Sequence, residues 1–199
     1  PEYRPGMPLG AVGCDGSGIA MAAEVGAATA HMDRISAWRF INPPLAFAQG
    51  LLVDAAGDRF VNEALYGAAI GEAIVRRAGG RGILILDAAL VRQARKQVGR
   101  GKTHWFQTAP ALLNLWFNSR KADTLEGLAR RCGMDPDKLV RTVGRANGEG
   151  PDPQGKPEGF RARLATPPFY AIDCGIRSKV FPLPTLTLGG LVVSEGSGA

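Results

Sequence analysis

Polar side chains gather at the junction between a short hairpin and a helix. The stretch LLVDAAGDRFVN at residues 51–62 predicts two short strands around a turn, and an apolar helix follows directly. Packing at this junction requires only apolar residues, yet the chain also places Arg59, Asn62, Glu63 and Tyr66 there. A carboxylate and a phenol are groups that can transfer protons. The junction is therefore the first candidate for a site that handles a proton.

Residue type alone leaves the roles of these side chains open. Carboxylates that cap helices are commoner than catalytic ones, so we interpret Arg59, Asn62 and Glu63 as scaffold, with an Asn–Glu pair that caps the helix. Tyr66 either packs at the helix start or directs its hydroxyl into a site. The other aromatic residues pose a choice between the core and a pocket for a flat apolar substrate; they are Trp38, Trp105, Phe106, Trp116 and Phe117.

The elements around the junction predict a mixed α+β fold. Asp15 stands at an N-cap position before a small-residue helix, Asp123 with Glu126 forms a capping box, and Asp135 precedes a proline that starts a helix. The helices are expected at residues 16–30, 67–77, 88–98, 125–132 and 136–147, and the strands at 31–41, 82–87, 167–173 and 180–193. Loops are expected at 99–110 and 148–159.

Composition and charge argue against several classes of protein. The net charge is +6, but the basic residues are scattered over the polar sides of predicted helices without a nucleic-acid motif, so no nucleic-acid partner is expected. No apolar run approaches the roughly 18 residues that would cross a membrane. Cys14, Cys132 and Cys174 form no CxxC pair, which argues against a disulfide framework or a metal site and fits a reducing cytoplasm.

The order of several segments resembles one large family. CDGSGIAMAAEVGA, GDRFVNEALYG, TLEGLARRCGMDPDKLVRTV, PPFYAI and TLTLGGLVV follow one another as in the FAD-dependent oxidoreductases. That family includes fumarate reductase and succinate dehydrogenase flavoproteins and the 3-ketosteroid dehydrogenases. The resemblance covers essentially all 199 residues, and GDRFVNE together with TLGGL is its most specific part. The DGSGI and NEALY segments lie nearer the ketosteroid dehydrogenase side.

The resemblance implies a substrate-binding cap domain at residues 31–180, between flanks of an FAD-binding domain at 1–30 and 181–199. The chain contains no GxGxxG fingerprint, so we expect a fragment of a longer polypeptide that is inactive alone.

The same resemblance implies which residues contact the cofactor FAD. The family's aspartate contact maps onto Asp15, with Gly16 allowing close backbone approach. Leu186, Gly189 and Gly190 resemble the segment that passes near the isoalloxazine. A plain helix N-cap at Asp15 and a β-turn at the two glycines are the alternatives.

The resemblance also separates two classes of substrate. Fumarate reductases carry an arginine four residues after the glutamate of FVNE, where Gly67 stands here, and their dicarboxylate-binding histidines are replaced by Trp38 and by Thr185 with Leu186. Without these groups a dicarboxylate is not expected to be held. In ketosteroid dehydrogenases a tyrosine near this junction acts in proton abstraction or relay, which implies Tyr66 as the catalytic residue. The implied reaction is dehydrogenation of a CH–CH bond in a 3-ketosteroid or similar cyclic ketone.

Two other functions stay open from the sequence. A fumarate reductase-like flavoprotein with an altered substrate would oxidise reduced flavin with fumarate. A non-catalytic basic binding module would be retained on DNA or acidic lipid in a salt-sensitive way. For the favoured reading, the expected partners are an apolar ketone and the FAD-binding part of the same polypeptide. An isolated cap would expose the surface that meets that part, so we expect homo-oligomers.

Overall fold

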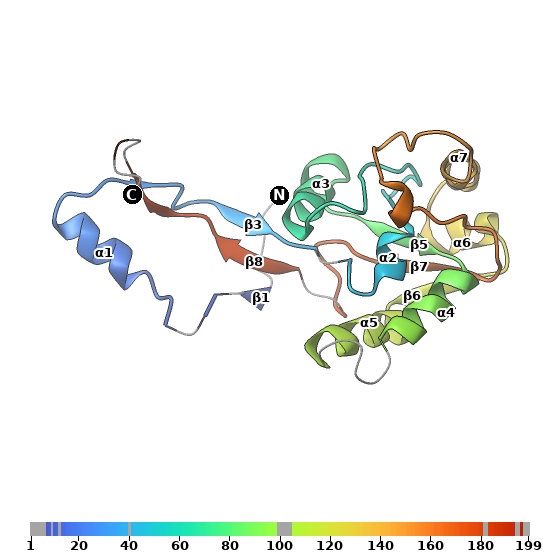
Figure 1. The fold of residues 1–199 in the computed structure, drawn as a ribbon, viewed down its shortest axis with the longest axis horizontal. Helices are drawn as coiled ribbons and strands as arrows, with labels where there is room; N and C mark the ends of the chain where they lie inside the picture. The colour runs from blue at the N-terminus through green and yellow to red at the C-terminus, as the bar shows by residue number, and fades with distance from the viewer. Residues whose placement is uncertain are drawn as a thin grey trace. The chain divides into compact units, whose positions relative to one another are not determined.

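The computed structural model divides the chain into two compact units. It describes residues 7–8, 10–11, 13–39, 41–98, 105–180, 183–193 and 196, and at 7, 8, 105–108 and 110 it describes the backbone alone. The first unit comprises Pro1–Ala37 with Pro184–Ala199, and the second comprises Trp38–Leu183. Figure 1 shows the elements of both units. The predicted boundaries lay at 30/31 and 180/181, and the parent domain of each unit stays a prediction.

A four-stranded antiparallel sheet is the centre of the second unit. Its order is β4 (Leu51–Val53), β5 (Ile83–Leu86), β7 (Phe169–Asp173) and β6 (Ser119–Ala122). In register, Leu52 lies opposite Leu84, and Leu84 opposite Ile172. Every residue of β4 and β5 is buried, because the apolar runs LLV and ILIL have both faces covered. The core of the unit is built on these strands.

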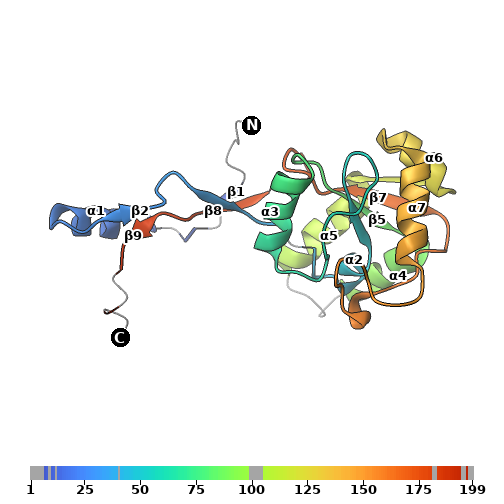
Figure 2. The ribbon, with the colours of Figure 1, turned by 90° about the horizontal axis from the view of Figure 1, so that it is seen from above.

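Helices pack around this sheet. They are α2 (Leu45–Ala48), α3 (Gly67–Arg77), α4 (Ala88–Gln97), α5 (Trp105–Phe117), α6 (Leu125–Cys132), α7 (Pro136–Ala146) and the 3-10 turn η1 (Glu158–Phe160). Helices α6 and α7 lie side by side (Figure 2). The carboxylate of Asp87 caps α4 through Leu90 N at 2.8 Å and also accepts from Ala165 N and Thr166 N. One buried carboxylate therefore holds the start of α4 against the segment that leads into β7.

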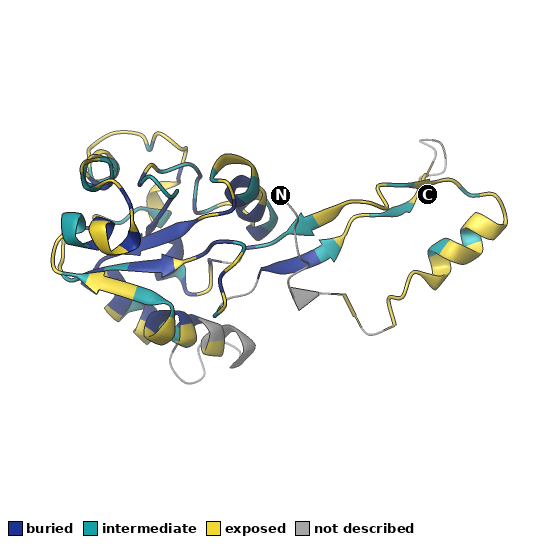
Figure 3. Cartoon of the chain, turned by 180° about the vertical axis from the view of Figure 1, so that it is seen from behind, coloured by how far each residue is buried: buried dark blue, intermediate teal, exposed yellow. Residues whose placement is uncertain are grey.

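The first unit contains short strands and one exposed helix. Strands β1 (Met7–Pro8), β8 (Pro184–Thr187) and β3 (Ile35–Ala37) form a sheet in that order. Strand β2 (Thr29–Ala30) pairs with β9 (Gly190–Leu191). The helix α1 (Ser17–Glu24) has no buried residue, and Figure 3 shows it exposed over most of its surface. A helix rich in Ala and Gly that buries nothing lacks the packing that normally stabilises such a segment.

The mixed α+β class is confirmed, as are most elements with strong local signals. Helix α3 begins and ends at the predicted residues 67 and 77, and Gly79 and Gly80 after it have positive φ angles of 58° and 83°. Asp135 caps α7, and Gly133 ends α6 in the left-handed conformation. Strand β5 lies within the predicted residues 82–87.

Other elements differ from their predictions. The second hairpin strand is only an isolated bridge between Val53 and Arg59. Residues 105–110, predicted as loop, belong to α5, and β6 was not predicted. Pro110 lies inside α5, a position at which a proline normally disfavours a helix. Residues 99–104 of that predicted loop lie outside the described residues.

Two helix caps were assigned one residue too early. The N-cap of α1 is Gly16, at φ 83°, and Asp15 instead accepts a hydrogen bond from Ser17 N at 2.9 Å. The N-cap of α6 is Thr124, whose hydroxyl accepts from Gly127 N at 3.0 Å, so Asp123 does not form the predicted capping box. In both cases a polar residue stands next to the true cap position, and the sequence pattern does not separate the two registers.

The corrected cap of α6 can be tested by comparing neighbouring substitutions. Replacing Thr124 with alanine should lower the free energy of unfolding by about 1 kcal/mol, because Gly127 N loses its acceptor. Replacing the adjacent Asp123 with alanine is the matched control and should change it by less than about 0.5 kcal/mol. Urea denaturation followed by circular dichroism measures both. A larger loss of stability in Asp123→Ala than in Thr124→Ala would instead support the predicted capping box.

Candidate functional site

Tyr66 lies at the N-terminal end of α3, and its side chain is exposed. It is the N-cap residue, in an extended conformation with φ −63° and ψ 146°, and it offers no side-chain cap to the helix. Its exposed fraction is 67%, whereas Gly67 directly after it is buried. An extended residue followed by a buried small one turns its side chain away from the packed helix start. Most of the Tyr66 surface is therefore not packed against this chain, contrary to the packing alternative.

The ring of Tyr66 meets one other aromatic ring among the described residues. Its centroid lies 4.8 Å from that of Trp38, and the two planes are inclined by 82°. This is the edge-to-face arrangement that aromatic pairs favour. Tyr66 and Trp38 thus form a small aromatic corner at the start of α3.

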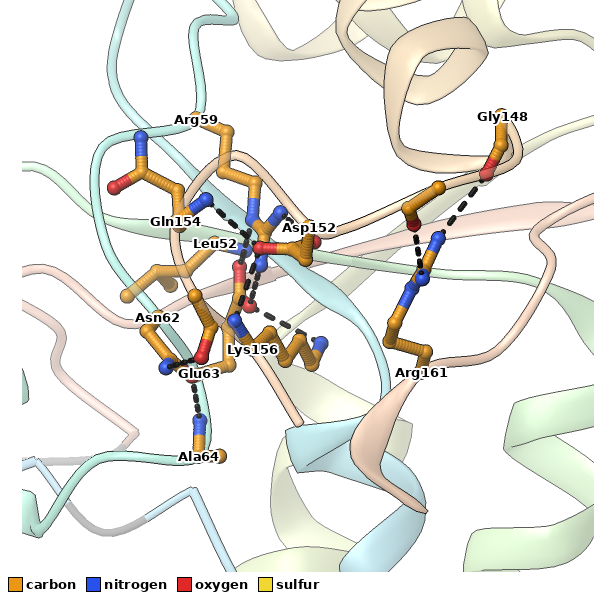
Figure 4. Close-up of polar contacts among 12 residues, drawn as sticks. Leu52, Arg59, Asn62, Glu63, Ala64, Gly148, Asp152, Gln154, Lys156 and Arg161 are labelled. Atoms are coloured by element: carbon orange, nitrogen blue, oxygen red, sulfur yellow. Dashed lines mark hydrogen bonds and ion pairs between the residues drawn. The ribbon is translucent and has the colours of Figure 1, made fainter. Parts of the chain in front are cut away.

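Glu63 is the centre of a buried polar network (Figure 4). The residue is 1% exposed, and its Oε1 accepts from Leu52 N at 2.7 Å and from Arg59 Nε at 2.9 Å. Its Oε2 accepts from Arg59 Nη2 at 2.6 Å and from Lys156 Nζ at 3.1 Å. One carboxylate therefore compensates two buried cations and also satisfies a backbone N–H of β4.

The network fastens the loop at residues 148–157 to the junction. Asp152 accepts from Arg59 Nη1 at 2.6 Å, and Lys156 Nζ donates to Gly50 O at 2.6 Å. Asn62 Nδ2 donates to Gly155 O at 2.9 Å. Further along, Arg161 donates to Gly148 O and Gly150 O. The segment predicted only as a polar loop is held by side chains at both of its ends (Figure 4).

Burial and pairing act in opposite directions on the ionisable groups of this network. Burial lowers the pKa of Lys156, and the nearby Glu63 only partly offsets that effect. Burial alone would raise the pKa of Asp152. Hydrogen bonds from Arg59 and from backbone N–H groups lower this pKa by more than burial raises it, so the net pKa is below the usual carboxyl value. Asp152 is thus held as a carboxylate that supports the guanidinium of Arg59.

The scaffold interpretation of the junction residues agrees with these contacts, but the predicted capping is wrong. Asn62 and Glu63 do not cap α3; Asn62 Oδ1 accepts from Ala64 N at 2.9 Å, and Glu63 binds β4 and two cations. The sequence analysis missed Asp152 and Lys156. They lie about 90 residues from Arg59 and Glu63, in a loop that also carries Glu149 and Glu158. No local signal marks which of these charges is buried.

The predicted FAD-contact residues near α1 are open to solvent. Asp15 is exposed, and the hydrogen bond from Ser17 N lowers the pKa of its carboxyl group. A Cβ built on Gly16 or Gly18 would meet no atom within 4 Å. An ionised carboxylate beside open glycine backbone fits a hydroxyl-bearing ligand such as the ribose of FAD. The assignment of Asp15 and Gly16 as FAD contacts stays a prediction.

The predicted contacts near the isoalloxazine are Leu186 in β8, Gly190 in β9 and Gly189 in the link between these two strands. Leu186 O accepts from Ser36 Oγ at 3.3 Å within the β3–β8 pair. A Cβ on Gly189 would lie 2.7 Å from Met32 Sδ and 2.8 Å from Met32 Cα, so this glycine is required by packing within the first unit. A Cβ on Gly190 would meet nothing. Gly190 is therefore the glycine whose missing side chain leaves room for an outside group.

A small cavity of the second unit lies against strands β5 and β7. Its volume is about 30 Å³, room for roughly one water molecule. Trp116 and Phe117 are 60% and 72% exposed, so the core alternative is excluded for these two residues. The predicted positions Trp105 and Phe106 have side chains outside the described residues. The lining of the cavity is Ile41, Pro43, Phe47, Leu84, Ala111, Asn114, Ile172 and Cys174.

The described residues hold neither a metal-binding cluster nor a membrane-spanning helix. They contain no group of three or more His, Cys, Asp or Glu side chains that could hold a metal ion. Cys14 is exposed, Cys132 and Cys174 are buried, and all three are free thiols. No helix in the described ranges is long and apolar enough to cross a membrane.

Comparison with known proteins gives matches along the whole chain. The family model described as "FAD binding domain" matches residues 1–197. A 3-oxo-5-alpha-steroid 4-dehydrogenase of Comamonas testosteroni is 41% identical over 202 residues, which cover 100% of this chain and 38% of that protein. A protein of Shewanella frigidimarina named "Probable fumarate reductase Ifc3" is 26% identical over 190 residues, which cover 90% of this chain and 29% of that protein.

A solved structure of a related enzyme matches the fold of this chain. The 3-ketosteroid-Δ4-(5α)-dehydrogenase of Rhodococcus jostii RHA1, solved in complex with 4-androstene-3,17-dione, matches with a TM-score of 0.68 at 28% identity. The match covers 90% of this chain and 35% of that one. The chain thus spans less than two fifths of the length of these relatives, and its fold is one that they share.

Proposed function

The chain belongs to the FAD binding domain family, and on that premise we propose that it is the substrate-binding cap with two flanks of the FAD-binding domain in an FAD-dependent oxidoreductase. Trp38–Leu183 would be the cap, and Pro1–Ala37 with Pro184–Ala199 would belong to the FAD-binding domain. The proposed reaction of the whole protein is dehydrogenation of a CH–CH bond next to the ketone of a 3-ketosteroid. The observation that carries the proposal is the 41% identity to a steroid 4-dehydrogenase over the full chain.

Uncovered apolar surface supports the proposed identity of the first unit. Helix α1 buries no residue, and the large apolar side chains exposed in this unit include Met21, Val25, Met32, Leu188, Val192 and Val193. Large apolar side chains that stay exposed in number are typical of an interface. The remainder of an FAD-binding domain would cover it.

The exposed polar groups of the same unit would hold FAD. The Asp15 carboxylate would accept a hydrogen bond from a cofactor hydroxyl, and the backbone at Gly16 and Gly190 would allow close approach. When bound, FAD supplies an acceptor for the hydride that leaves the substrate. The part left to the protein is to orient the substrate and to move the accompanying proton.

Tyr66 is the proposed proton-transfer residue. Dehydrogenation removes a hydride from one carbon and a proton from its neighbour, and the electron pair of the broken C–H bond forms the new double bond. The Tyr66 oxygen would take that proton, directly or as part of a relay. Its exposure on a fixed corner of α3 supports this role, because the hydroxyl can reach a ligand while the backbone stays in place.

Anaerobic bleaching of the full-length flavoprotein tests the proposed substrate class. We expect a panel of 3-ketosteroids to remove the visible absorbance of the oxidised flavin, and succinate to leave it unchanged. Gly67 stands where a fumarate reductase carries arginine, which supports this expectation. Bleaching by succinate would instead assign the fumarate reductase-like alternative. If neither class bleaches the flavin, the steroid part of the proposal is wrong and the family assignment stands alone.

A further inference from the structure

The backbone on both sides of Tyr66 is fixed by long-range contacts. Three residues before it, the Glu63 carboxylate is held by β4, Arg59 and Lys156. Directly after it, Gly67 O accepts from Arg39 N at 2.9 Å. Tyr66 O itself accepts from Ile70 N at 3.1 Å. The Cα of Tyr66 therefore has little freedom to move.

The side chain of Tyr66 has more freedom than its backbone. It is 67% exposed, and a tyrosine at such a position can choose among staggered χ1 rotamers. The edge-to-face contact with Trp38, at 4.8 Å between centroids, is available to only some of these orientations. The Trp38 ring therefore selects among the directions in which the phenol can point.

Trp38 is itself well placed for this task. The next residue, Arg39, is 0% exposed, and its Nη2 donates to Gly175 O at 3.0 Å. Arg39 N also donates to Gly67 O. Two neighbouring residues, Trp38 and Arg39, therefore contact Tyr66 through its ring and Gly67 through its backbone. The anchor that orders the backbone of α3 thus also places the indole.

We propose that Trp38 is a positioning residue that orients the Tyr66 phenol for proton transfer. The proposal rests on the proposed function, in which Tyr66 moves the substrate proton. A group that transfers a proton must be within hydrogen-bond reach of the atom concerned, and a misplacement of about 1 Å can lower a rate on the order of 100-fold. Trp38 acts through Tyr66 and need not touch the substrate.

Stopped-flow bleaching of the full-length holoprotein by saturated 5α-androstane 3-ketones, with Trp38→Leu and Trp38→Phe variants, tests this role. Trp38→Leu removes the aromatic edge, so we expect the limiting rate of bleaching to fall roughly 10- to 100-fold, with less than about a threefold change in the steroid dissociation constant. Trp38→Phe keeps an aromatic ring and should retain the rate within about threefold. If Trp38→Leu has a larger steroid dissociation constant and an unchanged limiting rate, the proposal is overturned and Trp38 is a binding residue.

A double variant separates positioning from general damage. In a Tyr66→Phe background the hydroxyl is gone, so adding Trp38→Leu should lower the limiting rate little further. Losses that multiply in the double variant would overturn the proposal. Near-ultraviolet circular dichroism adds a readout independent of activity, because the coupled rings should give non-additive changes in the single and double variants.

The same set of variants distinguishes the two hypotheses. If Tyr66→Phe bleaches at the full rate, the proposed role of Tyr66 is wrong, and the role of Trp38 falls with it. If Tyr66→Phe is slow while Trp38→Leu keeps the full rate, the role of Tyr66 stands and Trp38 is not its positioning residue.

Discussion

Replacing Tyr66 with phenylalanine is expected to lower the limiting rate of flavin bleaching by a 3-ketosteroid by roughly 10²- to 10⁴-fold. The variant removes only the hydroxyl group, and Tyr66 as a whole is 67% exposed. The free energy of unfolding should therefore change little. The steroid dissociation constant should also stay nearly constant, because the apolar ring remains.

The chain contains a matched control for this measurement. Tyr170 lies in β7, is half-buried and packs against the core, so Tyr170→Phe makes the same chemical change away from the aromatic corner. It should leave the bleaching rate unchanged while it affects stability slightly. Equal rates for the Tyr66 variant and the wild type would show that Tyr66 does not move the proton. Equal losses in both variants would show a general effect of removing a hydroxyl.

Replacing Glu63 with alanine should destabilise the protein by about 3–5 kcal/mol. The substitution leaves Arg59 and Lys156 buried, with side chains 7% and 2% exposed, and removes the carboxylate that pairs with both. Leu52 N also loses its acceptor. Arg59 keeps its ion pair with Asp152, so the expected size reflects mainly the cost of leaving the buried Lys156 without its carboxylate.

Glu72 provides the control for the charge itself. It forms an i,i+4 ion pair with Arg76 on α3, with side chains 61% and 76% exposed, so Glu72→Ala should cost no more than about 0.5 kcal/mol. Urea denaturation compares the two variants. Limited proteolysis should in addition show faster cleavage within residues 148–157 in the Glu63 variant, because the loop loses the ion pair between Lys156 and Glu63. Similar midpoints for both variants would contradict the role assigned to the buried network.

The segments that were predicted well carry their signals locally. Helix α3 is bounded by a glycine-rich end, α7 by Asp135 and Pro136, and β5 is a short apolar run before Asp87. In each case the deciding interactions lie within a few residues: a cap, a terminating glycine or an apolar period. The order of these segments also carried the family resemblance. FAD as the cofactor followed from the same order, without any knowledge of contacts.

The errors occurred where distant packing or a one-residue choice decides. Residues 105–110 read as a loop but lie in α5, and β6 is paired only through β7, some 50 residues later in the chain. The caps at Gly16 and Thr124 differ from the predicted ones by one residue. A strand or helix whose stability comes from a partner far along the chain leaves little trace in its own residues.

The sequence by itself determined the α+β class, the family and the positions of the strongly capped helices, because those depend on local pattern and segment order. The tertiary structure decided which polar residues work together. It joined Arg59 and Glu63 to Asp152 and Lys156, and it left Tyr66 open beside Trp38. A buried charge is costly unless an opposite charge or a hydrogen bond compensates it. Which charges are buried depends on the folded chain, so residue types alone do not reveal it.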